Sequence, residues 1–203
     1  MILLSRLKKY LKFFALLGIV GHTYTSRAYS CDGEVGFPHG NGGGFVALTA
    51  YVEPSVYVGS EAIVCGFAQV YGNARLEENS YVADHAIIKG NVILSNWAEV
   101  YNFAYVESTS LGKGIVVNDG SIYGHSIVRN AAYIIEDAEV FGNAEVNGNS
   151  EISGHAKVYG NAKLYDALLF DNVSVHGEVK VINEAEIRGN TTLCDNKTIS
   201  EDV

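Results

Sequence analysis

The chain has 203 residues, of which 48% are hydrophobic and 18% are charged, with 23 acidic side chains against 14 basic ones. This composition excludes a disordered chain, which combines low hydrophobicity with high charge. The net charge of −9 repels phosphate and argues against a nucleic-acid partner. With 22 glycines and only 2 prolines, the chain is not collagen-like either.

Residues 1–30 have the pattern of a secretory signal peptide. Four basic residues and no acid lie within 1–12, and the apolar run FFALLGIVG follows at 13–21. Ala28-Tyr29-Ser30 has small residues at both ends of the expected cleavage site. A retained N-terminal anchor is the alternative. Cleavage after Ser30 leaves 9 basic against 23 acidic residues, a net charge of −14. We therefore expect a secreted or periplasmic protein that does not dock on an anionic membrane.

The rest of the chain repeats every six residues. Every sixth residue is Val, Ile or Leu in three runs, from Val46 to Val106, from Val116 to Leu164 and from Leu169 to Ile199. The residue two places earlier is mostly Ala or Ser, and Gly-Asn pairs recur between units. Residues two apart share one face of a strand, so each unit predicts a short strand with both of these positions inward. Gly and Asn tolerate the left-handed backbone of a tight corner. We expect an all-β fold in which three units make one triangular coil of 18 residues.

This pattern resembles the hexapeptide-repeat family over about residues 45–200. The sequence Val-Tyr-Gly-Asn-Ala at 70–74 and 158–162 is similar to a subgroup of acyltransferase-like proteins built from such "VYGNA" runs. The resemblance implies a left-handed parallel β-helix of about eight to nine coils and a homo-oligomer, commonly a trimer. It also implies acyl transfer from an acyl-coenzyme A donor with a histidine as general base. Residues 31–44 would form a Gly-rich cap and 201–203 a polar tail.

Two irregular spacings predict changes at the corners. Val106 and Val116 are ten residues apart, so we expect a corner enlarged by four residues into a loop at 108–113. Its polar residues are candidates for contact with a ligand: Ser108, Thr109, Ser110 and Lys113. Leu164 and Leu169 are five residues apart, which predicts that Ala167 takes the small inward position and that the corner shrinks to Asp166.

With this register, one outward column of a single sheet is aromatic. It contains Tyr101, Tyr123, Phe141, Tyr159 and His176, each one coil above the last. One interpretation is a stacked ladder that stabilises the coil itself. The other is a flat aromatic face for a protein or glycan partner.

The candidates for catalysis are few. His85 and His125 share a corner but lie two coils apart, about 9.6 Å, which is too far for one metal ion. The 108–113 loop contains no histidine, whereas a general base must reach its substrate. We therefore predict a non-catalytic exported scaffold or binding protein without a cofactor or metal. The alternative is an acyltransferase that uses His85 or His125.

The three cysteines are an odd set for an exported protein. Cys65 and Cys194 lie seven coils apart, beyond the reach of a disulfide. Cys31 lies in the Gly-rich segment 31–44 that is expected to fold over the first coil, from where it can reach Cys65 in the second coil. The alternative is three free thiols.

Overall fold

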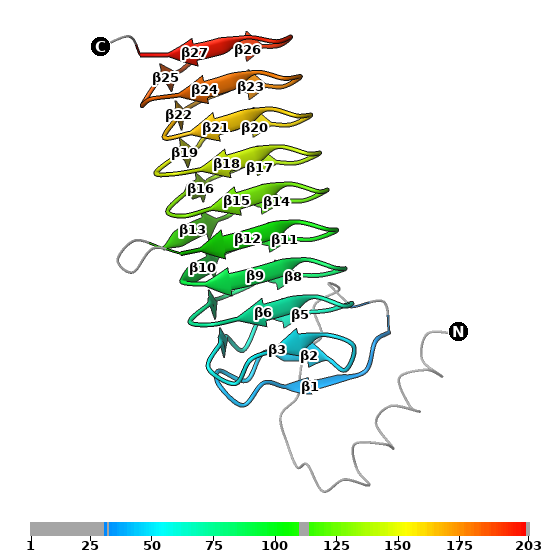
Figure 1. Cartoon of the computed structure of the whole chain (residues 1–203). Helices are drawn as coiled ribbons and strands as arrows, with labels where there is room; N and C mark the ends of the chain where they lie inside the picture. Colours follow the sequence, from blue (N-terminus) through cyan, green and yellow to red (C-terminus); the bar gives the residue numbers. More distant parts are fainter. Residues whose placement is uncertain (1–30, 32, 110–113, 202–203) are drawn as a thin grey trace, which may run out of the picture. The chain divides into compact units, whose positions relative to one another are not determined.

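A computed structural model describes residues 31, 33–109 and 114–201, and every regular element in them is a strand. The expected signal peptide therefore lies outside the described residues. The strands form a stack of coils, and those on the near side run from right to left as the chain rises from blue to red (Figure 1). This is left-handed winding. The prediction of a left-handed parallel β-helix is confirmed.

Three sheets form the sides of the prism, and every pairing apart from β1 with β2 is parallel. Sheet A contains β1 (Gly36–Pro38), β2 (Phe45–Ala47), β5 (Ile63–Val64), β8 (Tyr81–Val82), β11 (Glu99–Val100), β14 (Ser121–Ile122), β17 (Glu139–Val140), β20 (Lys157–Val158), β23 (Ser174–Val175) and β26 (Thr192–Leu193). Sheet B contains β3 (Tyr51–Val52), β6 (Gln69–Tyr71), β9 (Ile87–Gly90), β12 (Tyr105–Ser108), β15 (Ile127–Arg129), β18 (Glu145–Asn147), β21 (Lys163–Tyr165), β24 (Lys180–Ile182) and β27 (Thr198–Ser200). Sheet C contains β4 (Tyr57–Val58), β7 (Arg75–Leu76), β10 (Val92–Ser95), β13 (Ile115–Asn118), β16 (Tyr133–Ile135), β19 (Glu151–Ile152), β22 (Leu168–Leu169) and β25 (Glu186–Ile187).

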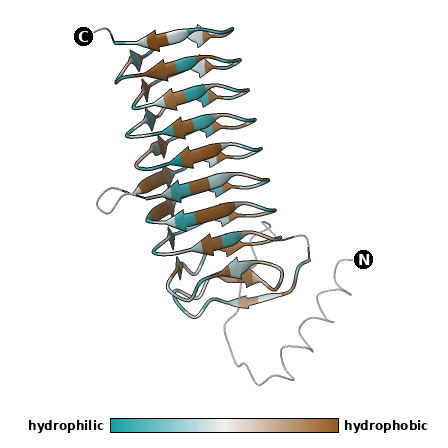
Figure 2. Ribbon diagram, viewed as in Figure 1, coloured by the Kyte–Doolittle hydropathy of each residue, from teal (hydrophilic) through white to brown (hydrophobic). Residues whose placement is uncertain are grey.

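The core is a continuous column of the inward positions of all three sheets. Val100 and Ile134 are fully buried, as are small residues such as Ala98 that precede the aliphatic side chains. Apolar segments recur in every coil of the stack (Figure 2). Burial of one such aliphatic side chain contributes about 1.5–3 kcal/mol. The hexad pattern therefore favours this fold because it places a large aliphatic residue, most often preceded by a small one, inside the sides of successive coils.

Acidic residues take part in closing the corners. Asp84 has a left-handed backbone (φ 59°), and its carboxylate accepts hydrogen bonds from the backbone nitrogen of Asn102 at 3.0 Å and from that residue's side-chain amide at 2.8 Å. Glu136 (φ 60°) accepts a bond from the backbone nitrogen of Gly154 in the same way. Each bond joins a corner to the coil above it. Part of the acidic excess thus connects successive coils.

The segment before the first coil covers part of its open end. Strand β1 pairs antiparallel with β2, and the backbones of Asn41 and Gly44 form hydrogen bonds to Val58 of sheet C. Cys31 forms a disulfide with Cys65 and is buried with it. An uncovered strand edge would be a template for pairing with another chain. This segment occupies that edge on two of the three sheets.

The expected register at the large corner was wrong by one residue. Val116 is only half-buried and faces outward, whereas Ile115 and Val117 are fully buried. The physical reason is pairing, because Val117 lies opposite Leu94 and Ile134 in the neighbouring strands. Five residues are therefore inserted before β13, and the following corner is one residue shorter than usual. Gly120 fills the small position there, where an added Cβ would lie 2.7 Å from the Ile134 side chain.

The second irregular spacing is as expected. Ala167 and Leu169 are both fully buried, and Asp166 has a left-handed backbone (φ 51°) at the shortened corner. Strand β22 therefore stays in register with β19 below it and β25 above it. The coil absorbs both insertions and deletions at corners and keeps its strands in register.

Candidate functional site

The outer face of sheet A carries the expected aromatic column, and its stacking is confirmed. From Tyr101 through Tyr123, Phe141 and Tyr159 to His176, consecutive ring centroids are 4.8–5.0 Å apart and the planes are within 16° of parallel. All five side chains are half-buried. We call them the sheet-A ladder. Because each inner ring is covered on both faces, the ladder presents ring edges to solvent.

Polar side chains border this ladder on the same sheet. The Tyr123 hydroxyl donates a hydrogen bond to Glu139 at 2.7 Å, and Lys157 donates another to the same carboxylate at 2.6 Å. Partial burial opposes ionisation of Glu139, but these two bonds outweigh it and hold its pKa below the ordinary value. Burial and the bond to Glu139 raise the pKa of the Tyr123 phenol. The border is thus a fixed ion pair rather than a set of free charges.

Glu99 occupies the same column as Glu139 but has a different environment. Burial raises the pKa of its carboxyl group, and its pairing partners in the sheet are Tyr81 and Ser121. The pKa of Tyr101 beside it is raised by burial, and then by the charges of Glu99, Glu139 and Asp84. Two carboxyl groups on one face therefore differ in how readily they ionise.

A second ladder, which sequence analysis missed, follows the corner between sheets A and B. The rings of Phe67, His85, Phe103 and His125 stack in this order, with centroids 5.2, 4.9 and 4.9 Å apart. Phe67 and Phe103 are 58% and 54% exposed, so this row is more accessible than the sheet-A ladder. We call it the corner ladder. Its signal was present, because each member lies three residues after an inward aliphatic residue of sheet A.

The structure does not bring the candidate catalytic residues together. His85 and His125 lie on opposite faces of the Phe103 ring. The insertion lies at a different corner, between β12 of sheet B and β13 of sheet C. Within one protomer, neither imidazole is therefore adjacent to the residues that flank the insertion.

The predicted loop is only partly within the described residues. Ser108 ends β12 and is buried, and the Thr109 hydroxyl donates a hydrogen bond to the Asn130 side chain at 2.6 Å. Both residues thus continue the coil rather than leave it. Ser110 and Lys113 lie outside the described residues.

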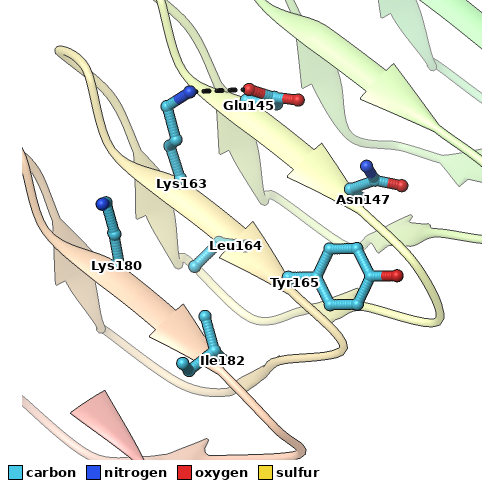
Figure 3. A pocket seen from close by; sticks show the side chains of 7 residues that line it. All are labelled: Glu145, Asn147, Lys163, Leu164, Tyr165, Lys180 and Ile182. Carbon is cyan, nitrogen blue, oxygen red and sulfur yellow. Dashed lines mark hydrogen bonds and ion pairs between the residues drawn. The ribbon is translucent and has the colours of Figure 1, made fainter. Parts of the chain in front are cut away.

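Sheet B has a shallow pocket near its upper end. It has a volume of about 260 Å³ and is lined by Glu145, Asn147, Lys163, Leu164, Tyr165, Lys180 and Ile182. Lys163 donates a hydrogen bond to Glu145 at 3.0 Å, and Lys180 lies on the neighbouring strand (Figure 3). Sequence analysis did not identify this pocket.

Cys65 occupies an outward position of sheet A, yet it is buried. The disulfide with Cys31 buries it against Ala83, which lies one coil below Tyr101 in the same outward column. Cys194 is a free thiol that donates a hydrogen bond to Asp195 at 3.4 Å. The disulfide thus lies at the lower end of the column that the sheet-A ladder continues.

Two other kinds of feature are absent from the described residues. No group of three or more His, Cys, Asp or Glu side chains there could hold a metal ion. No described helix is long and apolar enough to cross a membrane.

No protein-family model and no curated protein matches the chain. Among solved structures, LpxA from Acinetobacter baumannii is similar at 14% identity with a TM-score of 0.38. The match covers 76% of this chain and 66% of LpxA, just under two thirds of that protein's length. The hexad repeat, the three parallel sheets and the left-handed winding make this chain a hexapeptide-repeat left-handed β-helix.

Proposed function

We propose that the chain is an exported, non-catalytic binding protein whose sheet-A ladder and corner ladder together dock a protein partner. The observation that carries the proposal is the pair of adjacent ring stacks, which place nine rings along one side of the coil. The four steps of about 4.8 Å between its five rings give the sheet-A ladder a length of about 20 Å. A surface of this length suits one half of a standard protein interface.

The orientation of the rings favours a protein over a glycan on this side. Sugars pack on the faces of aromatic rings, but the faces of Tyr123, Phe141 and Tyr159 are covered by their neighbours. Ring edges carry the positive part of the aromatic quadrupole and suit carbonyl oxygens and other rings. Exposed Phe67 and Phe103 add apolar area of the kind that is buried at the centre of interfaces.

Stacking also prepares the surface for binding. Each ring of the sheet-A ladder is already held by its neighbours within a rigid coil, so docking immobilises few side chains. Loss of side-chain freedom normally costs about 0.5–1.5 kcal/mol per ordered residue on association. A partner therefore meets a surface that needs little reorganisation.

Export is part of the proposal. Residues 1–30 have the signal-peptide pattern, and a disulfide joins Cys31 to Cys65. Disulfides persist in oxidising compartments such as the periplasm and the extracellular space. Acyl-coenzyme A donors are cytoplasmic, which weighs against the acyltransferase that the resemblance to "VYGNA" proteins implies.

The resemblance also implies a homotrimer, in which the partner protein is a second copy of the chain. Replacement of Tyr123 and Phe141 by serine should then lower the mass measured by light scattering. A monomeric mass both before and after the substitutions would show that the chain does not associate with itself through this surface. The partner would then be a different protein.

A photo-crosslinking experiment tests the docking surface. A crosslinking amino acid at Phe103 should give adducts of discrete mass in the compartment that receives the exported chain. The same amino acid at Tyr133, which is 37% exposed on sheet C, is the control and should give none. Equal adducts from both positions would contradict the proposal.

Calorimetry with acetyl-coenzyme A tests the alternative. We expect no binding to the exported chain. Micromolar binding, together with acyl transfer that is lost in His85→Ala or His125→Ala, would replace the proposed function with an acyltransferase.

A further inference from the structure

We infer that the pocket on sheet B binds a sugar that carries a carboxylate, such as a uronic acid. The carboxylate would lie between Lys163 and Lys180, and the pyranose ring would cover Tyr165. This site lies on a different sheet from the two ladders. The inference therefore does not rest on the proposed function and can fail separately from it.

The outward cations of sheet B are neutralised coil by coil up to this pocket. Lys89 lies over the Tyr105 ring at 5.3 Å from its centroid. Arg129 lies 3.8 Å from a Glu145 oxygen, and Lys163 bonds to the other Glu145 oxygen at 3.0 Å. Each of these cations thus has an aromatic ring or a carboxylate within reach. One acid, Glu145, already serves two of them.

Lys180 ends this series without a partner. It lies directly opposite Lys163 on one side and Thr198 on the other, and none of the described residues forms an ion pair with it. Like charges directly opposite one another on adjacent strands are destabilising. The six strands from β9 to β24 of this sheet carry four basic and two acidic side chains, although the whole chain is acidic. An anion between Lys163 and Lys180 would relieve this repulsion.

The ring beside these lysines lies between Asn147 and Ile182 of the neighbouring strands, and neither of these is aromatic. Tyr165 is 51% exposed, and among the described residues no other ring stacks on it. This distinguishes it from the inner rings of the sheet-A ladder, whose faces are covered. The negative face of an aromatic ring attracts the weakly positive C–H groups of a pyranose. Ile182 extends the apolar wall on the neighbouring strand (Figure 3).

Size and charge narrow the ligand further. The pocket, at about 260 Å³, lies below the range of about 300–1,000 Å³ for small-molecule sites, so it suits one sugar residue rather than a coenzyme. Glu145 at its rim disfavours a dianion such as phosphate. The Asn147 side-chain oxygen already accepts hydrogen bonds from the Asn130 side chain and from the backbone nitrogen of Gly148, so its NH2 group is left to donate to a sugar hydroxyl. A single carboxylate on a sugar ring meets all of these conditions.

The test is an NMR titration of the chain at low salt with D-glucuronate. Saturable shifts are expected at the backbone amides of β21 and β24, with a millimolar dissociation constant. The uncharged methyl ester keeps the ring, and acetate keeps the carboxylate, so each should bind at least tenfold more weakly. Lys180→Met and Tyr165→Leu should each weaken glucuronate binding by about tenfold or more.

Lys157→Met is the matched control, because this lysine lies on sheet A and pairs with Glu139. It should leave the affinity for glucuronate unchanged, and circular dichroism should show that all variants keep the fold. Acetate binding as tight as glucuronate would reduce the site to a simple anion site and overturn the inference. Equal binding of the ester, wild-type affinity in Lys180→Met, or no saturation below about 100 mM would also overturn it.

Discussion

The contribution of the sheet-A ladder to stability can be measured by replacing Phe141 with leucine. This residue stacks on Tyr123 at 4.9 Å and on Tyr159 at 4.8 Å, with planes within 2° of parallel. Leucine keeps much of the apolar volume but removes both ring contacts. Aromatic pairs contribute about 0.5–1.5 kcal/mol each beyond area burial, so two contacts set an upper limit of about 3 kcal/mol. Because the rings are only half-buried, we expect a loss of about 1–2 kcal/mol.

A double-mutant cycle isolates the ring contact from other effects of the substitution. Phe141→Leu is combined with Tyr159→Leu, and urea unfolding should give a coupling energy of about 0.5–1.5 kcal/mol. Coils of a solenoid interact only with their neighbours. Hydrogen exchange of the amides in β17 and β20 therefore provides a local readout if unfolding is not two-state.

The matched pair for comparison is Phe141→Leu with Tyr133→Leu, which lies on sheet C away from the ladder. These two substitutions should be additive within about 0.5 kcal/mol. A coupling energy below about 0.3 kcal/mol in the ladder cycle would refute the reasoning. It would mean that the backbone register alone aligns the rings and that their contact adds no stability.

Three further outcomes are expected. Cys65→Ser should cost up to about 4 kcal/mol, because the disulfide closes a loop with a sequence separation of 34, and exchange of the β1 and β2 amides should rise first; unchanged exchange there would contradict this. Glu99→Gln should raise thermal stability at pH 7 and lose that effect in acid, because a carboxyl group with a raised pKa costs stability as pH rises from its unfolded pKa through its folded pKa. Glu139→Gln should be destabilising above the unfolded pKa of about 4.3, and this effect should fade as pH falls through the lowered folded pKa. A change in stability of the same sign for both substitutions at pH 7 would contradict this prediction. Gly90→Ala should destabilise more than Gly189→Ala, since both have positive φ but only at Gly90 would the new Cβ lie 2.1 Å from a backbone oxygen; equal melting temperatures would show that the corner yields.

The regular part of the fold could be predicted because the same pattern of inward residues recurs in many six-residue units. Each hexad shows an inward aliphatic residue, so an error in one unit is corrected by the next. At the large corner that support is lost, because Ile115, Val116 and Val117 are three consecutive apolar residues. The alternation of inward and outward residues then allows either Val116 or the pair Ile115 and Val117 to point inward. Only the pairing of Val117 with Leu94 decides between these two registers.

The candidate site was predictable to different degrees. The sheet-A ladder followed from an 18-residue spacing, and the same arithmetic would have found Phe67 and Phe103 of the corner ladder. The pocket on sheet B could not be found in this way. The one-coil spacing places Glu145, Lys163 and Lys180 opposite one another on successive strands, but it does not show that Glu145 bonds to Lys163 and leaves Lys180 without an ion pair among the described residues.

The three-sided coil restricts how this chain can lengthen in evolution. Duplication of 18 residues adds one complete coil, so each ring above the junction keeps its place in the same ladder. Duplication of six residues would rotate everything above it by one side, and Tyr159 would leave the line of Phe141 for another sheet. The insertion before β13 does not have this effect, because Val117 still pairs with Leu94 on the neighbouring strand of the same sheet. Selection for a continuous aromatic surface would thus favour growth by whole coils, with smaller changes in length confined to the corners.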